Sequence, residues 1–382
     1  MMIKIICSAQ AYTYNAYHIV KAFYPAVEIT NHVEEKASNY VEINFSDGQV
    51  IAVEKEEIKA GTDAEKKAQI DKKLYEKLSE KSGKTLAWGI LTGVRPTKLA
   101  MKKLEEGMEP EAFVSWFRQT YLVSEEKARL AWEIAGREKK LLDRLDYEDG
   151  YSLYVGIPFC PTVCTYCSFS SGALEDWKDF VDAYVEALCK ELAFIGEVSK
   201  EKKLNSIYIG GGTPTSLNAR QLERILSCID THFSREYLLE YTVEAGRPDS
   251  ITEEKLQVIK AHKVTRISIN PQTMQQKTLG VIGRKHTVED ICRTYEMARS
   301  LGFDNINMDL IAGLPGETAL DMKDTLEKVG RLQPDSLTVH SLAIKRAAKM
   351  GQEVKAGQEE GRESTLSPEI GEMIREAEKA AD

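Results

Sequence analysis

Residues 155–169 read Val-Gly-Ile-Pro-Phe-Cys-Pro-Thr-Val-Cys-Thr-Tyr-Cys-Ser-Phe, and this stretch decides the fold and the chemistry expected of the chain. Cys160, Cys164 and Cys167 stand in it with C-x3-C-x2-C spacing. Three thiolates this close can bind three irons of a [4Fe–4S] cluster and leave the fourth iron open to a small-molecule ligand. The spacing therefore predicts a cluster that takes part in chemistry as well as in electron transfer.

Two simpler interpretations of these cysteines are weaker. A structural zinc site needs four closed ligands, and the next cysteine along the chain is the distant Cys189. A disulfide is unusual in a reducing compartment, and the chain has an odd number of cysteines, seven. The other four stand at no metal-ligand spacing, and we expect small buried hydrophobes at Cys7, Cys189, Cys228 and Cys292.

The composition is that of an ordinary globular protein. The 382 residues are 29% charged and 42% hydrophobic, and the formal net charge is −9. A mildly acidic chain argues against a large nucleic-acid footprint. No apolar run approaches the roughly 20 residues of a membrane span, and the N-terminal apolar stretch is too short for a secretory signal. We therefore expect a cytoplasmic protein with no nucleic-acid partner and no membrane span.

From residue 151 to residue 345 the pattern alternates between strands and helices. Strand-like runs fall at 151–157, 206–209, 241–244, 266–269, 305–310 and 336–340. Helical patterns lie between them, including 177–197 with Phe180 on its apolar face, and 219–232 with Asn218 as N-cap and Gln221 three residues on. This alternation predicts an α/β fold with a parallel sheet and right-handed crossovers.

The flanking regions differ from this pattern. Residues 1–150 predict a smaller α+β domain, with a hairpin and helices at 63–80, 97–106, 110–118 and 123–145. The stretch Trp88–Thr97 interrupts these helices and contains Arg95. It is either a turn before a helix or a contact to the second domain or a ligand. The tail, 346–382, is highly charged, and we expect one solvated helix at 367–381.

Further motifs stand directly after the predicted strands, where a parallel barrel collects its functional residues. Gly210-Gly-Gly-Thr-Pro-Thr215 follows the second strand, and its glycines let a ligand approach the backbone closely. Glu244 ends the third strand and could bind ribose hydroxyls or an ammonium group, or could be a plain surface carboxylate. The runs 266–272 and 307–315 follow, with Arg284 between them. Their order along the chain is improbable by chance.

The cysteine stretch resembles the radical S-adenosylmethionine (SAM) enzymes, whose signature is C-x3-C-x-aromatic-C, with Tyr166 as the aromatic residue. In that family the amino and carboxylate groups of SAM bind the open iron. Reduction cleaves SAM into methionine and a 5′-deoxyadenosyl radical, which takes a hydrogen atom from the substrate. The cofactor carries this chemistry and the protein orients it. The resemblance implies a partial (β/α)6 TIM-like barrel at 151–345, preceded by the smaller domain.

The resemblance also implies a role for each motif residue. The cluster would lie on Cys160, Cys164 and Cys167. The residues that hold SAM would be Tyr166, Gly211, Gly212, Thr213, Glu244, Gln272, Arg284 and Asp309, with Ile311 at the adenine. Tyr154 stands where the family has a catalytic tyrosine near the cluster, and packing inside the barrel is an equal alternative.

Within this family the chain resembles the oxygen-independent coproporphyrinogen III oxidases, and most of all the HemZ-type dehydrogenases. The shared marks are 92–96 (TGVRP), 167–169 (CSF), 244–248 (EAGRP), 269–272 (INPQ) and 339–345 (VHSLAIK). The resemblance implies oxidative decarboxylation of two propionates of coproporphyrinogen III to vinyl groups, giving protoporphyrinogen IX for haem biosynthesis. The partners would be this tetrapyrrole and an electron donor such as flavodoxin or ferredoxin.

Two departures from the family keep other hypotheses open. Ser168 and Phe169 replace the further cysteine of the oxidases and resemble the Cys-Asp-Phe of haem chaperones, so haem binding, with His340 facing the site, is an alternative. Another radical SAM substrate is a third. We also expect that the family's C-terminal domain, which helps cover the substrate, is missing after the sixth strand. Candidates for propionate recognition are Arg247, Arg266 and Lys345.

Overall fold

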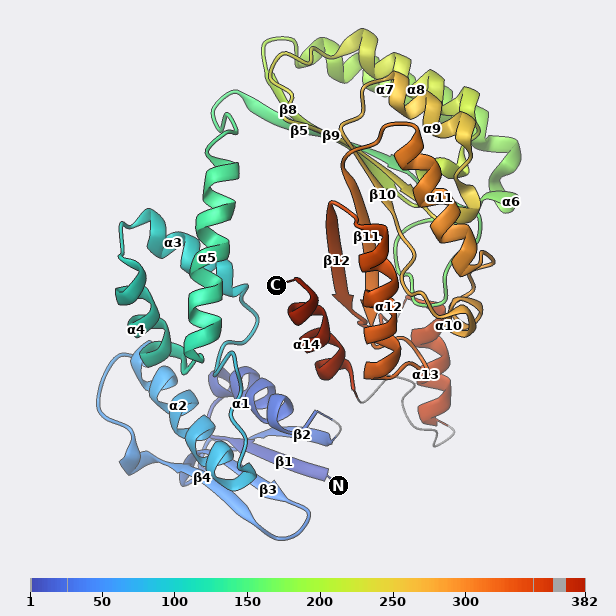
Figure 1. Ribbon diagram of the computed structural model, residues 1–382. Helices are drawn as coiled ribbons and strands as arrows, with labels where there is room; N and C mark the ends of the chain where they lie inside the picture. Colours follow the sequence, from blue (N-terminus) through green and yellow to red (C-terminus); the bar gives the residue numbers. More distant parts are fainter. Residues whose placement is uncertain (1, 26, 346, 360–368, 382) are drawn as a thin grey trace. The chain divides into compact units, whose positions relative to one another are not determined.

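The computed structural model describes residues 2–25, 27–345, 347–359 and 369–381 (Figure 1). The chain divides into two compact units, residues 1–144 and 145–382.

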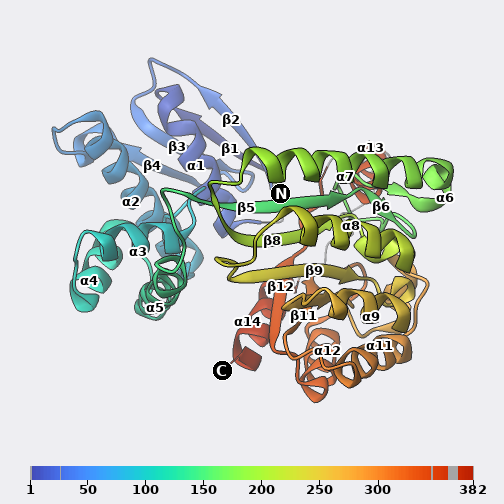
Figure 2. The ribbon, with the colours of Figure 1, turned by 90° about the horizontal axis from the view of Figure 1, so that it is seen from above.

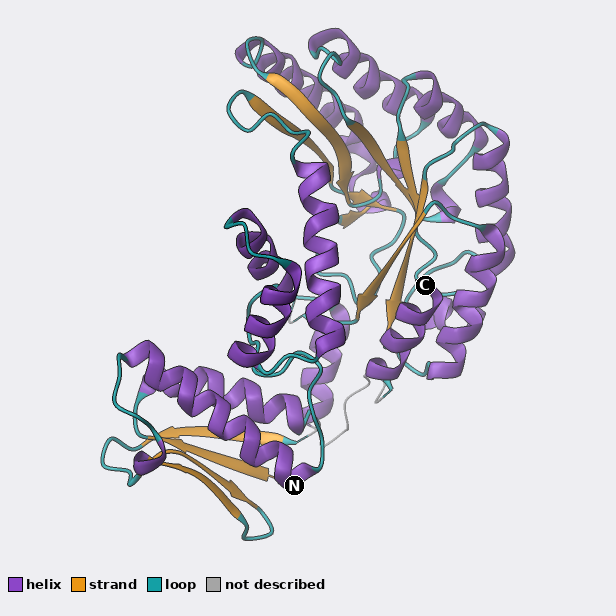
Figure 3. Cartoon of the chain, turned by 60° about the vertical axis from the view of Figure 1, so that its left-hand side comes forward, coloured by secondary structure: helices purple, strands orange, loops and turns teal. Residues whose placement is uncertain are grey.

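The first unit begins with a four-stranded mixed sheet in the order β2-β1-β3-β4. Its strands are β1 (Met2–Cys7), β2 (Glu28–Val33), β3 (Asn39–Phe45) and β4 (Val50–Glu54). The antiparallel β3–β4 hairpin confirms the prediction. Two helices, α1 (Gln10–Phe23) and α2 (Asp63–Ser82), cover one face of this sheet (Figure 3). The sequence did not predict α1 or β2.

Three further helices complete the first unit. They are α3 (Pro96–Glu105), α4 (Pro110–Tyr121) and α5 (Glu125–Leu142). Their own small core contains the fully buried Phe113 and Phe117. The stretch Trp88–Thr97 ends in the start of α3, with Arg95 as N-cap and Pro96 in the first turn, where its missing N–H costs nothing.

The second unit is built on a six-stranded parallel sheet, as the sequence predicts. The strands are β5 (Gly150–Ile157), β8 (Lys203–Gly211), β9 (Glu240–Gly246), β10 (Arg266–Ile269), β11 (Ile306–Ala312) and β12 (Ser336–Ser341). They pair in chain order, β12-β11-β10-β9-β8-β5. This arrangement is the open, partial barrel expected from the sequence. A short two-stranded sheet, β6 (Phe159–Cys160) with β7 (Gly172–Ala173), joins the two ends of the cysteine loop.

Helices line the outer side of the curved sheet (Figure 2). They are α6 (Leu174–Trp177), α7 (Val181–Val198), α8 (Ala219–His232), α9 (Glu253–Ala261), α10 (Gln276–Val281), α11 (Val288–Ser300) and α12 (Ala319–Leu332). Alternation along β5 explains the two sides, because Leu153, Val155 and Ile157 join the core under the helices while Tyr154 faces the inner side.

The two predicted helices between strands fared differently. The helix α8 has the predicted bounds, and Asn218 and Gln221 form the predicted capping box. The helix α7 begins four residues later than predicted, after a separate turn of 3-10 helix. Phe180 lies in that turn and is 62% exposed, so its placement on the buried face was wrong. The turn rotates its side chain away from the apolar stripe that Val181, Val185 and Leu192 bury.

The described part of the tail contains α14 (Ile370–Ala381), at the predicted helix, and a further helix, α13 (Lys349–Glu359), that the sequence did not predict. Arg346 and Ser367, where the tail and its helix are predicted to begin, lie outside the described residues. The prediction of a solvated helix was wrong for α14, because Met373 is fully buried and its sulfur accepts the Gly313 N–H at 3.1 Å. Apolar residues at helical spacing, 370, 373, 374 and 377, give this helix a buried stripe. No helix of the described residues is long and apolar enough to cross a membrane.

Candidate active site

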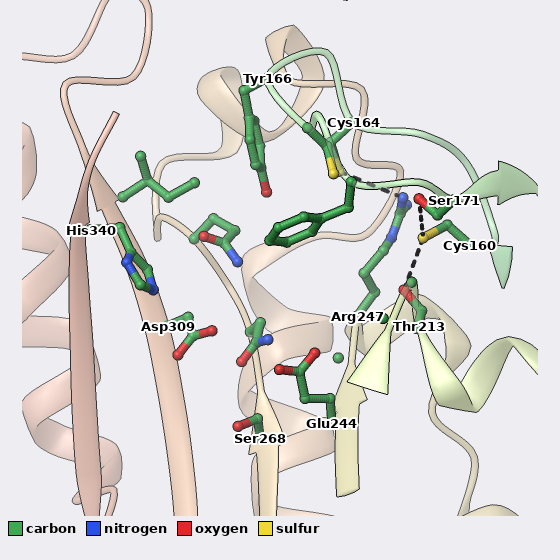
Figure 4. Close-up of a pocket in the computed structure, with 18 of the residues that line it drawn as sticks. Cys160, Cys164, Tyr166, Ser171, Thr213, Glu244, Arg247, Ser268, Asp309 and His340 are labelled. Atoms are coloured by element: carbon green, nitrogen blue, oxygen red, sulfur yellow. Dashed lines mark hydrogen bonds between the residues drawn. The ribbon is translucent and has the colours of Figure 1, made fainter. Parts of the chain in front are cut away.

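One cavity of about 680 Å³ lies on the inner side of the parallel sheet, at the carboxyl ends of its strands. Figure 4 shows that the side chains of the cysteine loop and of the strand ends point into it. The cavity is bordered by every residue predicted to hold the cluster or SAM, and by His340. Tyr154 instead borders an adjoining hollow, which it shares with Gly211 and Glu244.

The three cysteines reach this cavity from one loop. The loop turns back on itself where the Cys167 N–H donates to the Cys164 carbonyl at 3.1 Å. The Cys160 sulfur accepts from the Thr213 hydroxyl at 3.5 Å and donates to Ser171 Oγ at 3.6 Å (Figure 4). Burial raises the pKa of the Cys167 thiol, and the neighbouring Cys164 and Cys160 raise it further.

The thiols do not gather as ligands of a single ion. Within the described ranges no three Cys, His, Asp or Glu side chains are grouped closely enough to hold one metal ion. Three cysteine thiolates on one short loop could hold a [4Fe–4S] cluster, which takes one thiolate on each of three irons.

A buried arginine from the neighbouring strand end holds the loop in place. Arg247, which follows β9, is 3% exposed and donates Nη1 to the Thr162 carbonyl at 2.9 Å and to its hydroxyl at 2.7 Å. Its Nε and Nη2 bind the Asp249 carboxylate at 3.0 and 2.7 Å. The hypothesis that Arg247 recognises a propionate is therefore wrong, because its guanidinium N–H groups already bind Asp249 and Thr162.

The glycine motif packs against the same loop. The N–H groups of Gly212 and Thr213 donate to the carbonyls of Ile157 and Phe159, each at 2.7 Å. A Cβ on Gly212 would lie 2.5 Å from the Phe159 oxygen. Gly211 has a φ of +106°, which an L residue rarely adopts. The glycines are thus required for close packing of strand β8 against the cysteine loop, while they also border the cavity.

Glu244 forms the floor of the cavity with Tyr208. The Tyr208 hydroxyl donates to the Glu244 carboxylate. Burial raises the pKa of Glu244 above its ordinary value, the hydrogen bond from Tyr208 lowers it in part, and the nearby Asp309 raises it again. Tyr154 stacks on the Tyr208 ring at a centroid distance of 6.0 Å and is 61% exposed, so its side chain lies on the inner side of the sheet without being buried there.

Several buried polar atoms around the cavity lack a partner among the described residues. They are Asn270 Oδ1, Gln272 Oε1, Arg284 Nε and Arg266 Nε. Gln272 also has a φ of +70°, an unusual conformation that its backbone bonds to β11 hold in place. Buried polar groups in native proteins are normally paired, so this set of acceptors and donors fits a ligand with both an ammonium and a carboxylate group. The methionine part of SAM carries both.

The strands β10, β11 and β12 add a polar network that the sequence analysis missed. Asn307 donates to Asp309 Oδ1 at 2.7 Å and to Ser268 Oγ at 3.3 Å, and it accepts from Thr338 at 3.1 Å. Its members alternate along each strand with buried apolar residues, and Asp309 and Thr338 are paired in register. Period-two alternation of polar residues within runs already assigned as strands was the signal that could have found them.

The four cysteines outside the loop only partly match the prediction. Cys7 is fully buried, but Cys189, Cys228 and Cys292 are partly exposed. Cys189 and Cys228 also meet across the α7–α8 interface, where the Cys228 sulfur lies 3.3 Å from the Cys189 carbonyl oxygen. Their distance in sequence hid this contact.

The fold and the site together define a class of enzymes that depend on an iron–sulfur cluster. Residues 154–329 match the model of the Radical SAM superfamily. The chain belongs to the radical SAM superfamily.

The chain is similar to several curated members of that superfamily. Over 304 residues it is 43% identical to the oxygen-independent coproporphyrinogen-III oxidase-like protein HemZ of Bacillus subtilis (strain 168), which covers 78% of this chain and 60% of that protein. Over 194 residues it is 36% identical to the heme chaperone HemW of the same organism, which covers 50% of each. The chain spans about half of the curated relatives that it matches.

A solved structure supports the fold. The coproporphyrinogen III oxidase HemN of Escherichia coli, described as a radical SAM enzyme, superimposes with a TM-score of 0.52 and 27% identity. The match covers 63% of this chain and 54% of that one.

Proposed function

We propose that this chain acts in the oxygen-independent oxidative decarboxylation of coproporphyrinogen III, in which two propionates become vinyl groups and protoporphyrinogen IX forms. The observation that carries the proposal is that one cavity is bordered both by the three loop cysteines and by buried polar atoms of Asn270, Gln272 and Arg284 that lack a partner among the described residues. The similarity to HemZ supports this substrate over others, because it extends over 304 residues and so over more of the chain than the barrel alone.

In this proposal a [4Fe–4S] cluster binds to Cys160, Cys164 and Cys167, and SAM binds beside it. When bound, they supply the radical that removes a hydrogen atom from the substrate. The unpartnered Asn270 and Gln272 oxygens would accept from the SAM ammonium group, and Arg284, held by its bond to the Asn270 carbonyl, would donate to the carboxylate. Asp309 and Glu244 present carboxylates for the ribose hydroxyls, with Ile311 at the adenine.

Conversion of each propionate to a vinyl group removes one hydrogen atom from its β-carbon, one CO2 and one electron. The proposed reaction therefore needs an acceptor for that electron, and a donor such as flavodoxin or ferredoxin to reduce the cluster. Lys345 and Arg266 border the cavity and are the cations proposed to meet the substrate carboxylates. Arg266 binds Ser336 Oγ with Nη2 at 3.1 Å, and its Nε has no partner among the described residues.

The test is a turnover experiment on protein reconstituted anaerobically with iron and sulfide. Reductant and SAM are added with and without coproporphyrinogen III, and 5′-deoxyadenosine and porphyrin products are followed by mass spectrometry. We expect 5′-deoxyadenosine formation that depends on the tetrapyrrole, with the loss of two CO2 units. Equal 5′-deoxyadenosine with and without substrate, and no vinyl product, would contradict the proposal.

A second candidate function, haem binding, has its own observation. Ser168 and Phe169 follow Cys167 in place of a further cysteine, the heme chaperone HemW is 36% identical over 194 residues, and His340 borders the cavity. This function predicts a stoichiometric haem complex without decarboxylation. Haem titration of the unmodified protein and of His340→Ala, followed by the Soret band, distinguishes the two candidates, because only a haem-binding site would lose its ligand.

A further inference from the structure

A line of polar and charged side chains runs from His286 through Asp249 and Arg247 to the cysteine loop. The His286 ring nitrogen Nδ1 lies 3.4 Å from Asp249 Oδ1, and Asp249 binds Arg247 through both of its oxygens. Arg247 Nη1 then reaches the loop at Thr162 and lies 4.0 Å from the Cys164 sulfur (Figure 4). Thr162 in turn donates to the Gly283 carbonyl at 3.2 Å.

This line is shielded from water at both of its ends. The exposed fractions of the side chains are 3% for Arg247 and 22% for Asp249, and the His286 side chain has none. Burial raises the pKa of Asp249, but its contacts with His286 and Arg247 outweigh burial and leave the pKa well below its ordinary value. Asp249 is therefore a carboxylate at neutral pH. A full positive charge and its counterion thus lie in order behind the Cys164 sulfur.

We infer that Arg247 raises the reduction potential of the cluster on Cys160, Cys164 and Cys167, and that Asp249 limits this effect as its counterion. The inference rests on the cofactor assignment of the proposed function. Hydrogen bonds and charges beside cluster sulfurs are established controls of cluster potential. Reduction adds a negative charge to the cluster, so a nearby guanidinium group stabilises the reduced state more than the oxidised one.

The order of Arg247 and Asp249 predicts potential shifts of opposite sign for their two variants, which a simple loosening of the loop would not produce. Arg247 lies nearer to the sulfur than Asp249 does, because it stands between them. Removing the arginine charge should lower the potential, whereas removing the carboxylate charge and keeping the arginine should raise it. Both changes remove the same ion pair, so a purely structural role would move the potential in one direction or not at all.

The barrel offers a matched control at a distance from the cavity. Arg235 pairs with Asp230, which contacts His262 at 2.7 Å, so the same three residue types recur there. None of the three borders the cavity. Arg235→Gln should therefore leave the potential unchanged, although it removes a similar ion pair.

The experiment compares the unmodified protein with Arg247→Gln, Asp249→Asn and Arg235→Gln, all reconstituted anaerobically without SAM. Midpoint potentials come from reductive titration followed by electron paramagnetic resonance, and iron per chain is measured in parallel. We expect a more negative potential for Arg247→Gln, a more positive one for Asp249→Asn, and no change for Arg235→Gln. Shifts of the same sign, or no shift, for the two site variants would overturn the inference.

A substitute variant and a check on cluster assembly complete the test. If Asp249→Asn does not fold, Arg247→Lys replaces it, because a retained charge with fewer donors should give a potential between those of the unmodified protein and Arg247→Gln. A potential for Arg247→Lys equal to or below that of Arg247→Gln would refute a role for charge. If the unmodified protein assembles no [4Fe–4S] cluster, the cofactor assignment and the proposed function fail first.

Discussion

The replacement Gly212→Ala tests whether the glycine motif serves packing as well as ligand binding. A Cβ at this position would lie 2.5 Å from the Phe159 oxygen and 2.9 Å from the Ile157 oxygen. Both are backbone atoms, so no side chain can rotate away. To reach ordinary contact, the Phe159 carbonyl must retreat by about 0.9 Å. That movement would stretch the two bonds that join strand β8 to the start of the cysteine loop.

The magnitude follows from these contacts. Overpacking of this kind costs about 1–3 kcal/mol, and each weakened hydrogen bond adds about 0.5–1.5 kcal/mol. With two hydrogen bonds weakened, the expected loss in the free energy of unfolding is therefore about 2–6 kcal/mol. For a unit of this size this loss corresponds to a fall in Tm of about 4–24 °C.

The assay is thermal unfolding of the protein without cofactors, followed by circular dichroism, with iron content after reconstitution as a second readout. The control is Gly330→Ala in α12, where an added Cβ meets nothing within 4 Å. There we expect a gain of about 0.5–1 kcal/mol, because alanine favours a helix over glycine. If Gly212→Ala unfolds within about 1 °C of the unmodified protein, the packing argument is refuted.

Three further predictions concern single groups of the barrel. Tyr241→Phe should raise the free energy of unfolding by about 1 kcal/mol, because the hydroxyl of this fully buried residue has no hydrogen-bond partner among the described residues; a loss of stability in denaturant titration would contradict this. Asn218→Ala should cost about 1 kcal/mol by the same method through loss of the capping box of α8, and no loss would speak against the cap. Glu244→Gln should stabilise the protein without cofactors at neutral pH and weaken SAM binding. Because burial raises the pKa of Glu244, the folded state keeps its proton longer than the unfolded state, so stability falls as pH rises through that range. The Tm advantage of Glu244→Gln should therefore grow as pH rises above 4.5, the ordinary pKa of the carboxyl group, and a constant difference would refute the reasoning.

Much of the fold could be predicted because its signals are local. Five of the six parallel strands contain buried apolar residues, and α8 begins at a complete capping motif. The missed elements lack such signals. The helix α1 buries Thr13 and Ala16 beside its larger apolar residues, which blurs its stripe, and the edge strand β2 is mostly exposed and is held by its pairing with β1. Packing against the sheet for α1 and strand pairing for β2, rather than a local sequence pattern, stabilise these elements.

The candidate site divides in the same way. The cysteines and strand-end residues were predicted from motif order, because parallel strands bring their carboxyl ends to one edge. The role of Arg247 was missed because its partner Thr162 is 85 residues away in sequence. An arginine after a strand end has the same one-letter pattern whether it meets a substrate carboxylate or anchors a loop. Only its partners and its 3% exposure decide between these roles.

The two halves of the cavity differ in how strongly the chain determines their occupants. Around the cysteines, Gly212, Thr213 and Arg247 are fixed by hydrogen bonds to backbone carbonyls. We therefore expect these positions to stay the same whichever substrate binds. The candidate substrate cation Lys345 and the candidate haem ligand His340 lie on the exposed rim. Proteins that share this barrel can therefore keep one radical chemistry and bind different substrates through different rim residues, since function resides in the site rather than in the fold. For this reason variants of the rim should separate decarboxylation from haem binding, whereas variants near the cysteines should abolish cluster-dependent chemistry whichever substrate the chain takes.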